Sequence, residues 1–518
     1  MSSLTATNLT VIALLSAGAL VVNRIVFSKS RDGPPLPPGP PPTPVVGNIR
    51  GFDASAPWLT YTEWAAVYGD LVYSRFFNQD IIIINSEEVA RDLLDCRSHI
   101  YSDRPVMVTN DLIGIGFNSV LLRYSPKWRL HRRLLHQAFK QDNSLSFHPM
   151  QLRKAHQLLR GVLESPQKYE EHIRLHSGSV IMSAVYDYET APRDDPFLTV
   201  IDKAITIVVE EVQAHVAAIL GAFPFILSLP PWFPGLSIKR RATLCRQYVA
   251  KWLSEPFEYV QARVKSGTSG PSMVSDALEK WQNRDESGEV ATAIREAAAT
   301  AFLAASDTTA STLRVFVLAM VLYPEVQERA WSSIQSAIGT ARLPDFDDRT
   351  SLPYIDAVLR ETLRWHPVLP AGSVPHATYA DDIYNGYYIP KGAMILSNTW
   401  AMTRNEAKYP NPEKFVPERF LDGNGALTDD TCDMAFGFGR RVCVGRHLAD
   451  ASLWSCMALM LAAFKFSKQK DEKGIDIDFE PRWFSGLATH PLPFPCKITP
   501  RHEGMDMAKL NALIEASI

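Results

Sequence analysis

The sequence predicts a mainly α-helical body with a minor β region, preceded by an N-terminal transmembrane helix. Three observations support this fold class. Long segments carry apolar residues at helical spacing, β-branched runs are few and short, and an uncharged apolar stretch lies near the start of the chain. The 518 residues would suggest about three domains by length alone, but single enzymatic units of this size are common.

The N-terminal segment is expected to be a membrane anchor. Leu9 to Val22 is uncharged and mostly apolar, and Ile25 to Phe27 extend the run enough to cross a bilayer. Positive charges follow this run instead of preceding it, which separates it from a cleaved signal peptide. We therefore expect residues 1–30 to form an uncleaved, single-pass membrane anchor, in contact with membrane lipid, with the body in the cytosol. The alternative is a buried helix of a soluble protein.

A proline-rich segment follows the expected anchor. Residues 31–48 include the run G-P-P-L-P-P-G-P-P-P-T-P, which cannot form a helix and is expected to be a stiff, extended hinge. A proline-rich ligand for a partner domain has a similar composition and is the alternative interpretation. The catalytic domain is then expected to occupy residues 49–518.

Periodicity within the body predicts long helices and a few short strands. Proline residues mark several of the expected helix boundaries. The expected helices are Tyr124–Lys140, Arg295–Leu322, Pro324–Ile338, Tyr354–Arg364 and Arg446–Phe464, the expected strand is Asp80–Asn85, and a hairpin region is expected from Asp382 to Leu396.

Composition excludes several classes of protein. The net charge is −3 and no long block of either sign occurs, so nothing indicates binding to nucleic acid. Six cysteines without a repeating spacing, in so long a chain, do not predict a disulfide scaffold. They indicate a reducing compartment around the body.

One cysteine is the best candidate for a metal ligand. Cys443 lies in the loop F-G-F-G-R-R-V-C-V-G, directly before an apolar helical stretch that begins at Arg446. Glycines let backbone amides converge on the sulfur, and the positive N-terminal end of the helix is expected to lower the thiol pKa. A lone thiolate suits haem iron. The alternatives are a buried structural cysteine and a zinc ligand, but the other five cysteines form no C-x-x-C pair.

This loop resembles the haem-ligand signature F-x-x-G-x-R-x-C-x-G of the cytochrome P450 superfamily. Phe436, Gly439, Arg441, Cys443 and Gly445 match the signature in register. The resemblance covers nearly the whole chain after Pro34. It implies the cytochrome P450 fold, haem b (iron protoporphyrin IX) as cofactor and Cys443 as its iron ligand, with Phe436 and Gly445 in the cofactor-binding loop.

Other residues of the family pattern are expected to bind the two haem propionates. Trp128 and Arg132 match the family's W-x-x-x-R and lie on one helical face, while Arg441 lies two residues before the cysteine. Arginine suits a carboxylate because its planar fork donates two parallel hydrogen bonds. His376, in S-V-P-H-A, matches a family position that reaches a propionate. By itself, this histidine would more often be structural.

A buried ion-pair network is expected behind the cysteine loop. Glu361 and Arg364 are three residues apart in E-T-L-R and share one helical face. Arg419, in P-E-R-F, is the expected third member, as in the family's Glu-Arg-Arg arrangement, whose role is structural. A buried pair needs further hydrogen bonds to offset its desolvation. The alternative is a solvated surface pair.

The segment A-A-S-D-T-T lies in the middle of an expected helix. The Thr308 hydroxyl can bond to a carbonyl one turn earlier and bend the helix locally. The family's A/G-G-x-D/E-T pattern implies that Asp307 and Thr308 relay protons toward bound dioxygen. Ala305 replaces the usual glycine of that pattern. An ordinary Ser/Thr-rich helix is the alternative.

Electrons are expected to come from another protein. The only candidate nucleotide loop, Gly114 to Ser119, lacks a third glycine and a convincing strand before it. NADPH-cytochrome P450 reductase is the expected partner, with cytochrome b5 as a second donor. Basic residues that could face an acidic flavin domain are Lys127, Arg129, Arg133, Lys140, Arg440 and Arg446. An ordinary solvated face is the alternative for each of them.

The sequence therefore predicts a haem-thiolate monooxygenase that uses dioxygen to oxidise an apolar small molecule. The overall pattern resembles fungal enzymes of secondary metabolism. Two rival functions remain: a haem-thiolate isomerase or dehydratase that needs no electrons, and a haem protein that binds ligands without catalysis. Asp307 and Thr308 argue against both rivals.

Overall fold

The fold is taken from a computed structural model. It describes residues 33–49, 51–211, 219–221, 223–230, 237–281, 288–372, 374–486 and 488–517. The expected membrane anchor over residues 1–30 lies outside the described residues. Among the residues that are described, only the core helix Glu289–Leu322 is long and apolar enough to span a membrane, and most of its apolar stretch is buried.

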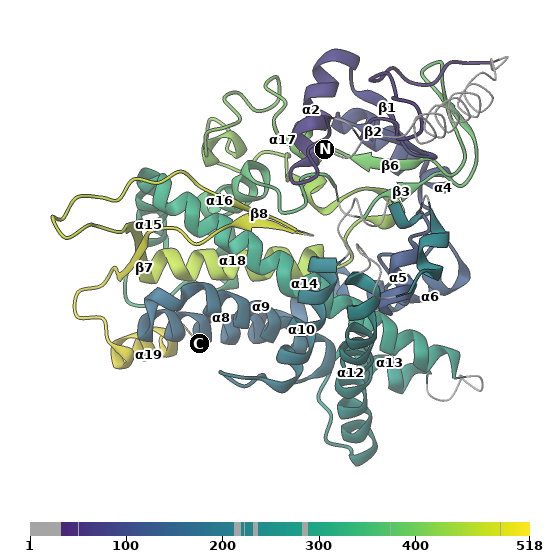
Figure 1. The fold of residues 1–518 in the computed structure, drawn as a ribbon. Helices are drawn as coiled ribbons and strands as arrows, with labels where there is room; N and C mark the ends of the chain where they lie inside the picture. The colour runs from purple at the N-terminus through teal and green to yellow at the C-terminus, as the bar shows by residue number, and fades with distance from the viewer. Residues whose placement is uncertain are drawn as a thin grey trace, which may run out of the picture.

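Helices make up most of the body, as the periodicity predicts (Figure 1). Prolines set several helix starts, because a proline at the first position lacks only an amide that would be unpaired anyway. The helices are α2 (Pro57–Tyr68), α3 (Glu87–Ala90), α4 (Ser98–Tyr101), α5 (Val108–Ile113), α6 (Pro126–Phe139), α7 (Gln141–Ser144), α8 (His148–Glu164), α9 (Tyr169–Tyr186), α10 (Pro196–Glu211), α12 (Ser237–Ser266), α13 (Met273–Trp281), α14 (Glu289–Leu322), α15 (Pro324–Ile338), α16 (Pro353–Trp365), α17 (Thr399–Thr403), α18 (Arg446–Ala463) and α19 (Met507–Glu515).

The centre of the body is a bundle around α14. Helices α9 and α18 pack against α14, and α8 packs against α9 and α18 (Figure 1). The apolar side chains of α18 are almost all buried, which explains why its sequence is apolar on every face. This bundle forms the larger of two main apolar cores, and the second core joins α14 to α6, α10, α12 and α13.

A small sheet lies beside the bundle. Strands β1 (Leu71–Phe76) and β2 (Gln79–Ile84) form an antiparallel hairpin, and β2 pairs in parallel with β6 (Met394–Ser397), which also pairs with β3 (His376–Ala377). The four isoleucines at the end of β2 are buried, as expected for a β-branched run covered on both faces. Three further pairs are β4 (Asp382–Tyr384) with β5 (Tyr387–Ile389), β7 (Phe464–Lys468) with β10 (Cys496–Pro500), and β8 (Trp483–Ser485) with β9 (Thr489–Pro491).

The described part of the proline-rich segment lies against the body. The carbonyl oxygen of Pro38 accepts a hydrogen bond from the amide of Tyr73, and that of Pro35 accepts one from Tyr388. At Gly39, a Cβ atom would lie 1.8 Å from the carbonyl oxygen of Tyr73, so only glycine allows this close approach. Residues from Gly33 onward are therefore packed on the strands.

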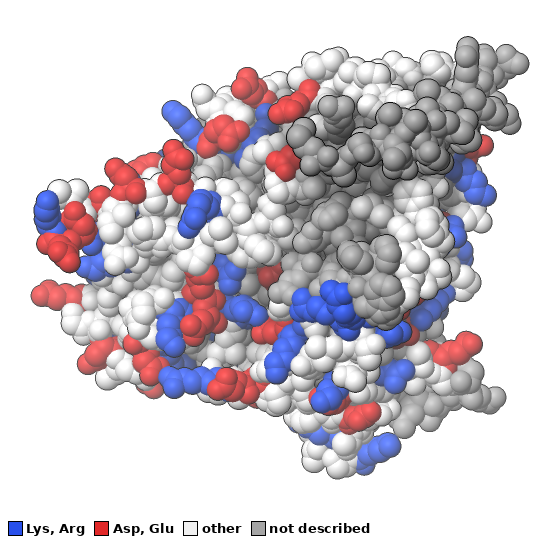
Figure 2. All heavy atoms as spheres, in the orientation of Figure 1, with Lys and Arg blue, Asp and Glu red and all other residues white. Residues whose placement is uncertain are grey.

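The surface carries charges of both signs. Figure 2 shows acidic and basic side chains interspersed over most of the described face, without a broad area of one sign. This distribution agrees with the small net charge of −3.

Candidate active site

The cysteine loop is tightly constrained. It consists of two short 3₁₀ turns followed by Cys443, whose amide donates to the carbonyl oxygen of Phe436 at 2.8 Å. Gly439 has φ of 59°, and a Cβ there would lie 1.8 Å from the Leu94 carbonyl oxygen. Its amide also donates to the Asp95 carboxylate. Only glycine fits this position, which explains one residue of the signature physically.

The thiol of Cys443 behaves differently from the sequence-based expectation. The amide of Gly445 and the guanidinium groups of Arg132 and Arg446 favour the thiolate, as predicted. Burial opposes them and is the larger effect, so the pKa of Cys443 is raised above its usual value. The expectation of a lowered pKa is wrong for the polypeptide alone, because the surrounding protein removes water from the sulfur. Coordination to a metal ion would deprotonate the thiol regardless.

The sulfur is nevertheless accessible. Cys443 is exposed, although protein surrounds it closely enough to desolvate it. Ala304 is also exposed, in the middle of the core helix α14, where Phe302 and Thr309 on either side are buried. Exposed positions inside a helical body suit a large prosthetic group that would cover them.

In the part of the chain that the structure describes, two arginines beside the cysteine donate hydrogen bonds only to main-chain carbonyls. Arg441 donates to the carbonyl oxygens of Ser102 and Leu122 at 2.9 and 2.8 Å, and its guanidinium lies 4.1 Å from the centre of the Trp128 ring. Arg132 donates to the Val442 carbonyl at 2.7 Å. Burial lowers the pKa of Arg441 to about 9 and that of Arg132 to about 10. Neither guanidinium group donates to a carboxylate among the described residues, and the attraction of Asp103 for Arg441 and of the Cys443 thiolate for Arg132 does not offset their burial.

Two further basic groups lie beside them. Arg104 is 3% exposed and donates to the carbonyl oxygens of Val120 and Val374. His376 donates its Nδ1 proton to the Tyr101 carbonyl at 2.8 Å. Burial lowers the pKa of both groups well below their usual values, and Arg104, with a smaller contribution from Arg441, lowers that of His376 further.

This basic cluster of Arg104, Arg132, His376 and Arg441 fits an anionic ligand. The nearest carboxylate, that of Asp103, already pairs with Arg123 at 2.5 Å and accepts from the amide of Tyr124. Several buried cations with carbonyl partners only are costly unless an anion completes the site. Two propionate groups would supply that charge, so the residues present fit haem.

The expected proton-relay residues lie on α14. The Thr308 hydroxyl donates to the Ala304 carbonyl at 2.8 Å, as the sequence predicts. Burial raises the pKa of Asp307, and the nearby cations Arg314 and Arg174 only partly oppose this effect. A carboxyl group with a raised pKa is better suited to carry a proton near neutral pH.

Ala305, which replaces the usual glycine of the family pattern, accepts a hydrogen bond from another helix. The hydroxyl of Ser177, on α9, donates to the carbonyl oxygen of Ala305 at 3.1 Å. Two consecutive carbonyls of α14, those of Ala304 and Ala305, thus accept side-chain hydroxyls. Such contacts tilt carbonyls away from the helix axis and bend a helix locally.

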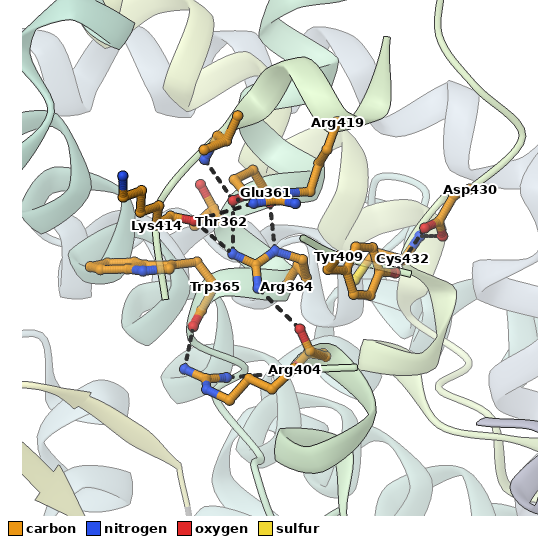
Figure 3. A network of polar contacts seen from close by, with 12 residues as sticks. Glu361, Thr362, Arg364, Trp365, Arg404, Tyr409, Lys414, Arg419, Asp430 and Cys432 are labelled. Atoms are coloured by element: carbon orange, nitrogen blue, oxygen red, sulfur yellow. Dashed lines mark hydrogen bonds and ion pairs between the residues drawn. The ribbon is translucent and has the colours of Figure 1, made fainter. Parts of the chain in front are cut away.

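The ion-pair residues form a buried network, drawn in Figure 3. The Glu361 carboxylate accepts from Arg364 Nε and Nη2 at 2.6 and 2.8 Å, and its distance to Arg419 Nε is 3.1 Å. The Val416 amide donates to it at 2.7 Å. Arg364 also donates to the Thr403 carbonyl, and both Glu361 and Arg364 are fully buried. The solvated alternative is therefore wrong, because no side chain of the pair reaches water.

Two residues of the site escaped sequence reasoning. Arg104 lies in the run S-D-R-P, and Ser177 lies on an apolar helix rich in small residues. Neither shows a spacing that indicates its partners, which come from distant parts of the chain.

A second thiol, that of Cys456 on α18, lies 3.0 Å from His176 Nε2 and is 1% exposed.

Comparison with known proteins agrees with this geometry. The cytochrome P450 family model matches residues 37–498. The chain is 38% identical to the cytochrome P450 monooxygenase ple1 of Rhodocybe pseudopiperita over 473 residues, covering 90% of both chains. It is 37% identical to claR of Ampulloclitocybe clavipes, covering 90% of this chain and 86% of the relative. It is 35% identical to COX1 of Coprinopsis cinerea over 517 residues, covering 95% and 97%. Both of these relatives are also cytochrome P450 monooxygenases.

The family model spans both the cysteine loop and α14. The relatives named above are monooxygenases, and each is similar to this chain over most of its length. The chain therefore belongs to the cytochrome P450 family and is a haem-thiolate monooxygenase.

Proposed function

We propose that this enzyme inserts oxygen into an apolar small molecule of fungal secondary metabolism, with Cys443 as the iron ligand. The resemblance to fungal monooxygenases supports the substrate class. Cys443 is preferred over Cys456 because its sulfur is exposed beside Arg132, whereas Cys456 is enclosed within the helix bundle.

The observation that carries this proposal is the basic cluster next to Cys443. The Cys443 thiol, just before α18, would bind the iron, and the basic cluster, whose members come from α6, β3 and two loops, would bind the propionates of the same cofactor. The guanidinium groups of Arg104, Arg132 and Arg441 would bind the propionates, and the Trp128 ring would stack on Arg441. His376 would join them by taking up a second proton at Nε2, which a nearby propionate favours, because its Nδ1 proton is already donated to Tyr101. When bound through a thiolate, haem supplies reductive cleavage of dioxygen.

The residues of α14 would manage the protons of this reaction. Asp307 would receive a proton from solvent, a role that the upward direction of its pKa favours. Thr308 would pass a proton onward from its hydroxyl, which the Ala304 carbonyl holds in one orientation. Ser177 would keep the neighbouring carbonyl of Ala305 in place.

Electrons would come from NADPH through cytochrome P450 reductase, with cytochrome b5 as a second donor. The exposed side chains of Arg133 and Arg440 and the half-exposed Lys127 and Lys140 offer positive charge to an acidic partner. A single-pass anchor over residues 1–30 would hold the enzyme in the endoplasmic reticulum membrane. Apolar substrate would then reach it from the lipid.

Carbon monoxide difference spectra of Cys443→Ser test the iron ligand. We expect the ferrous carbon monoxide band to leave its thiolate position in this variant. The matched control is Cys456→Ser, which should retain the thiolate band because His176 and the bundle enclose that sulfur. The opposite pattern would transfer the ligand role to Cys456.

Dependence on NADPH tests the reaction class. Candidate apolar compounds are first screened for a shift in the iron spin state on binding. Turnover of a hit should then need NADPH and a fungal reductase, and one oxygen atom of the product should derive from labelled dioxygen. Turnover without NADPH would instead support the isomerase or dehydratase, and binding without turnover would support a non-catalytic haem protein.

A further inference from the structure

A buried polar network lies between α6, α14 and the loop that precedes α6. His131 is fully buried, and Ser119, Thr300 and Glu296 are 6%, 3% and 8% exposed. Only Lys127 reaches solvent, with about half of its side chain exposed. Histidine and glutamate are seldom this deep in a core unless they are paired. The function proposed above uses Lys127 at the surface but none of the four buried residues.

The contacts form a continuous chain from the surface inward. Lys127 Nζ lies 2.8 Å from the Glu296 carboxylate. The same carboxylate lies 3.2 Å from His131 Nε2, which is within ion-pair distance of a protonated imidazole but is not a well-aligned hydrogen bond. On its other side, His131 Nδ1 lies 2.8 Å from the Ser119 hydroxyl. The amide of Ser119 donates to the Thr300 hydroxyl at 3.1 Å, and that hydroxyl donates to the Glu296 carbonyl at 2.8 Å. Contacts with His131 and Lys127 keep the pKa of Glu296 below its usual value, although burial opposes them.

The inner end of this chain meets the basic cluster. Arg441 Nη1 lies 3.4 Å from the carbonyl oxygen of Ser119, and Nη2 donates to the carbonyl of Leu122, three residues later. The segment is also held by Arg104, which donates to the Val120 carbonyl, and by local bonds from the amides of Leu121 and Leu122 to Asn118. His131 and Thr300 are thus the ties that fix Ser119 to the helices. The position of two Arg441 acceptors depends on them.

We propose that His131 is a positioning residue for Arg441. Together with Glu296 and Thr300, it fixes Ser119, and the carbonyls of residues 119–122 then hold the Arg441 guanidinium where it meets a haem propionate. Through this cation the network raises the reduction potential of the haem, because a nearby positive charge disfavours the more positively charged ferric state. This inference rests on the proposed binding of haem through Cys443.

Reduction potential and haem retention of the haem-loaded protein test this role. The variants are His131→Phe, which keeps the ring and removes both nitrogens, and Ser119→Ala, which removes one hydroxyl. Loss of one buried hydrogen bond changes an equilibrium constant by a factor of about three. We expect the potential to fall by about 28 mV, which is a threefold change for a one-electron couple. Haem transfer to excess apomyoglobin should become about threefold faster.

His156→Phe is the matched control. His156 lies on α8 and is 6% exposed, and among the described residues its Nε2 has no hydrogen-bond partner. This variant should retain the potential and the haem transfer rate of the unmodified enzyme. His131→Gln should recover part of the loss, since an amide can both donate and accept.

The results separate this inference from the proposed function. If the unmodified enzyme lacks a thiolate carbon monoxide band, the proposed function fails first. If that band is present and both Ser119→Ala and His131→Phe keep the original potential, the positioning role is overturned. If His131→Phe does not load haem, the reduction potentials of Ser119→Ala and Glu296→Gln decide whether the positioning role holds. A double-mutant cycle gives a further test. If His131→Phe lowers the potential of the Arg441→Lys enzyme as much as that of the unmodified enzyme, His131 does not act through the Arg441 guanidinium and the positioning role is overturned.

Discussion

Removal of the Glu361 charge should strongly destabilise the enzyme. In Glu361→Gln the buried guanidinium of Arg364 and the nearly buried one of Arg419 lose their only shared carboxylate, while the Val416 amide keeps an acceptor. Breaking a buried ion pair from one side costs about 3–5 kcal/mol. Glutamine retains one oxygen acceptor, so we expect a loss near the lower limit, about 3 kcal/mol in the free energy of unfolding.

Urea denaturation followed by circular dichroism measures this loss, provided that the unfolding free energy falls with urea concentration at the same slope in the variant and in the unmodified enzyme. The control is Glu171→Gln, since Glu171 forms an exposed 3.6 Å pair with Lys168 and such pairs contribute less than about 1 kcal/mol. We also expect less haem per protein for Glu361→Gln, because the network braces the segment that leads to the cysteine loop. A Glu361→Gln enzyme within 1 kcal/mol of the control, with full haem content, would refute this reasoning.

Four further predictions address single groups. Thr308→Ala should lower product formed per NADPH by at least about tenfold and raise hydrogen peroxide release, because the hydroxyl bound to Ala304 is lost; unchanged coupling would contradict the relay. Ser177→Ala should speed hydrogen exchange of the α14 amides near residue 308, whereas Ser179→Ala should not, because Ser179 bonds only within its own helix. In haem-free protein, alkylation of Cys443 should accelerate only at a pH above the usual thiol range, since burial raises its pKa; mass spectrometry of the labelled peptide measures this. Burial lowers the pKa of His176 to about 4 from 6.5, so the unfolded chain binds the proton first as pH falls. About 3 kcal/mol of stability, present above pH 6.5, should disappear by pH 4, and His176→Gln should flatten that dependence.

Local signals explain why the helices could be predicted. Pro324 and Pro353 begin their helices, and α15 runs over the predicted residues. Apolar spacing at 3.6 residues per turn depends only on neighbours in the chain. The predicted start of α14, Arg295, is six residues later than the observed start at Glu289. The residue before the helix is Gly288, which has no side chain to cap it, so no capping signal marks this start in the sequence.

Parts of the site are local in the same sense. Glu361 and Arg364 meet because they are three residues apart on one helix, and Thr308 meets the Ala304 carbonyl one turn earlier. The family signature specifies glycine at position 439. The physical reason, the close approach of the Leu94 carbonyl oxygen, is visible only in the folded structure.

The sequence by itself determined the family signature around Cys443, the helical class of the body and the residue types that chemistry at a haem requires. Only the tertiary structure decided which cations gather there without carboxylates. It also decided that burial outweighs the amides in the pKa of Cys443, and that His131 reaches both Ser119 and Glu296. The physical reason is that periodicity and spacing report neighbours along the chain, whereas desolvation and charge balance depend on every segment that packs around a group.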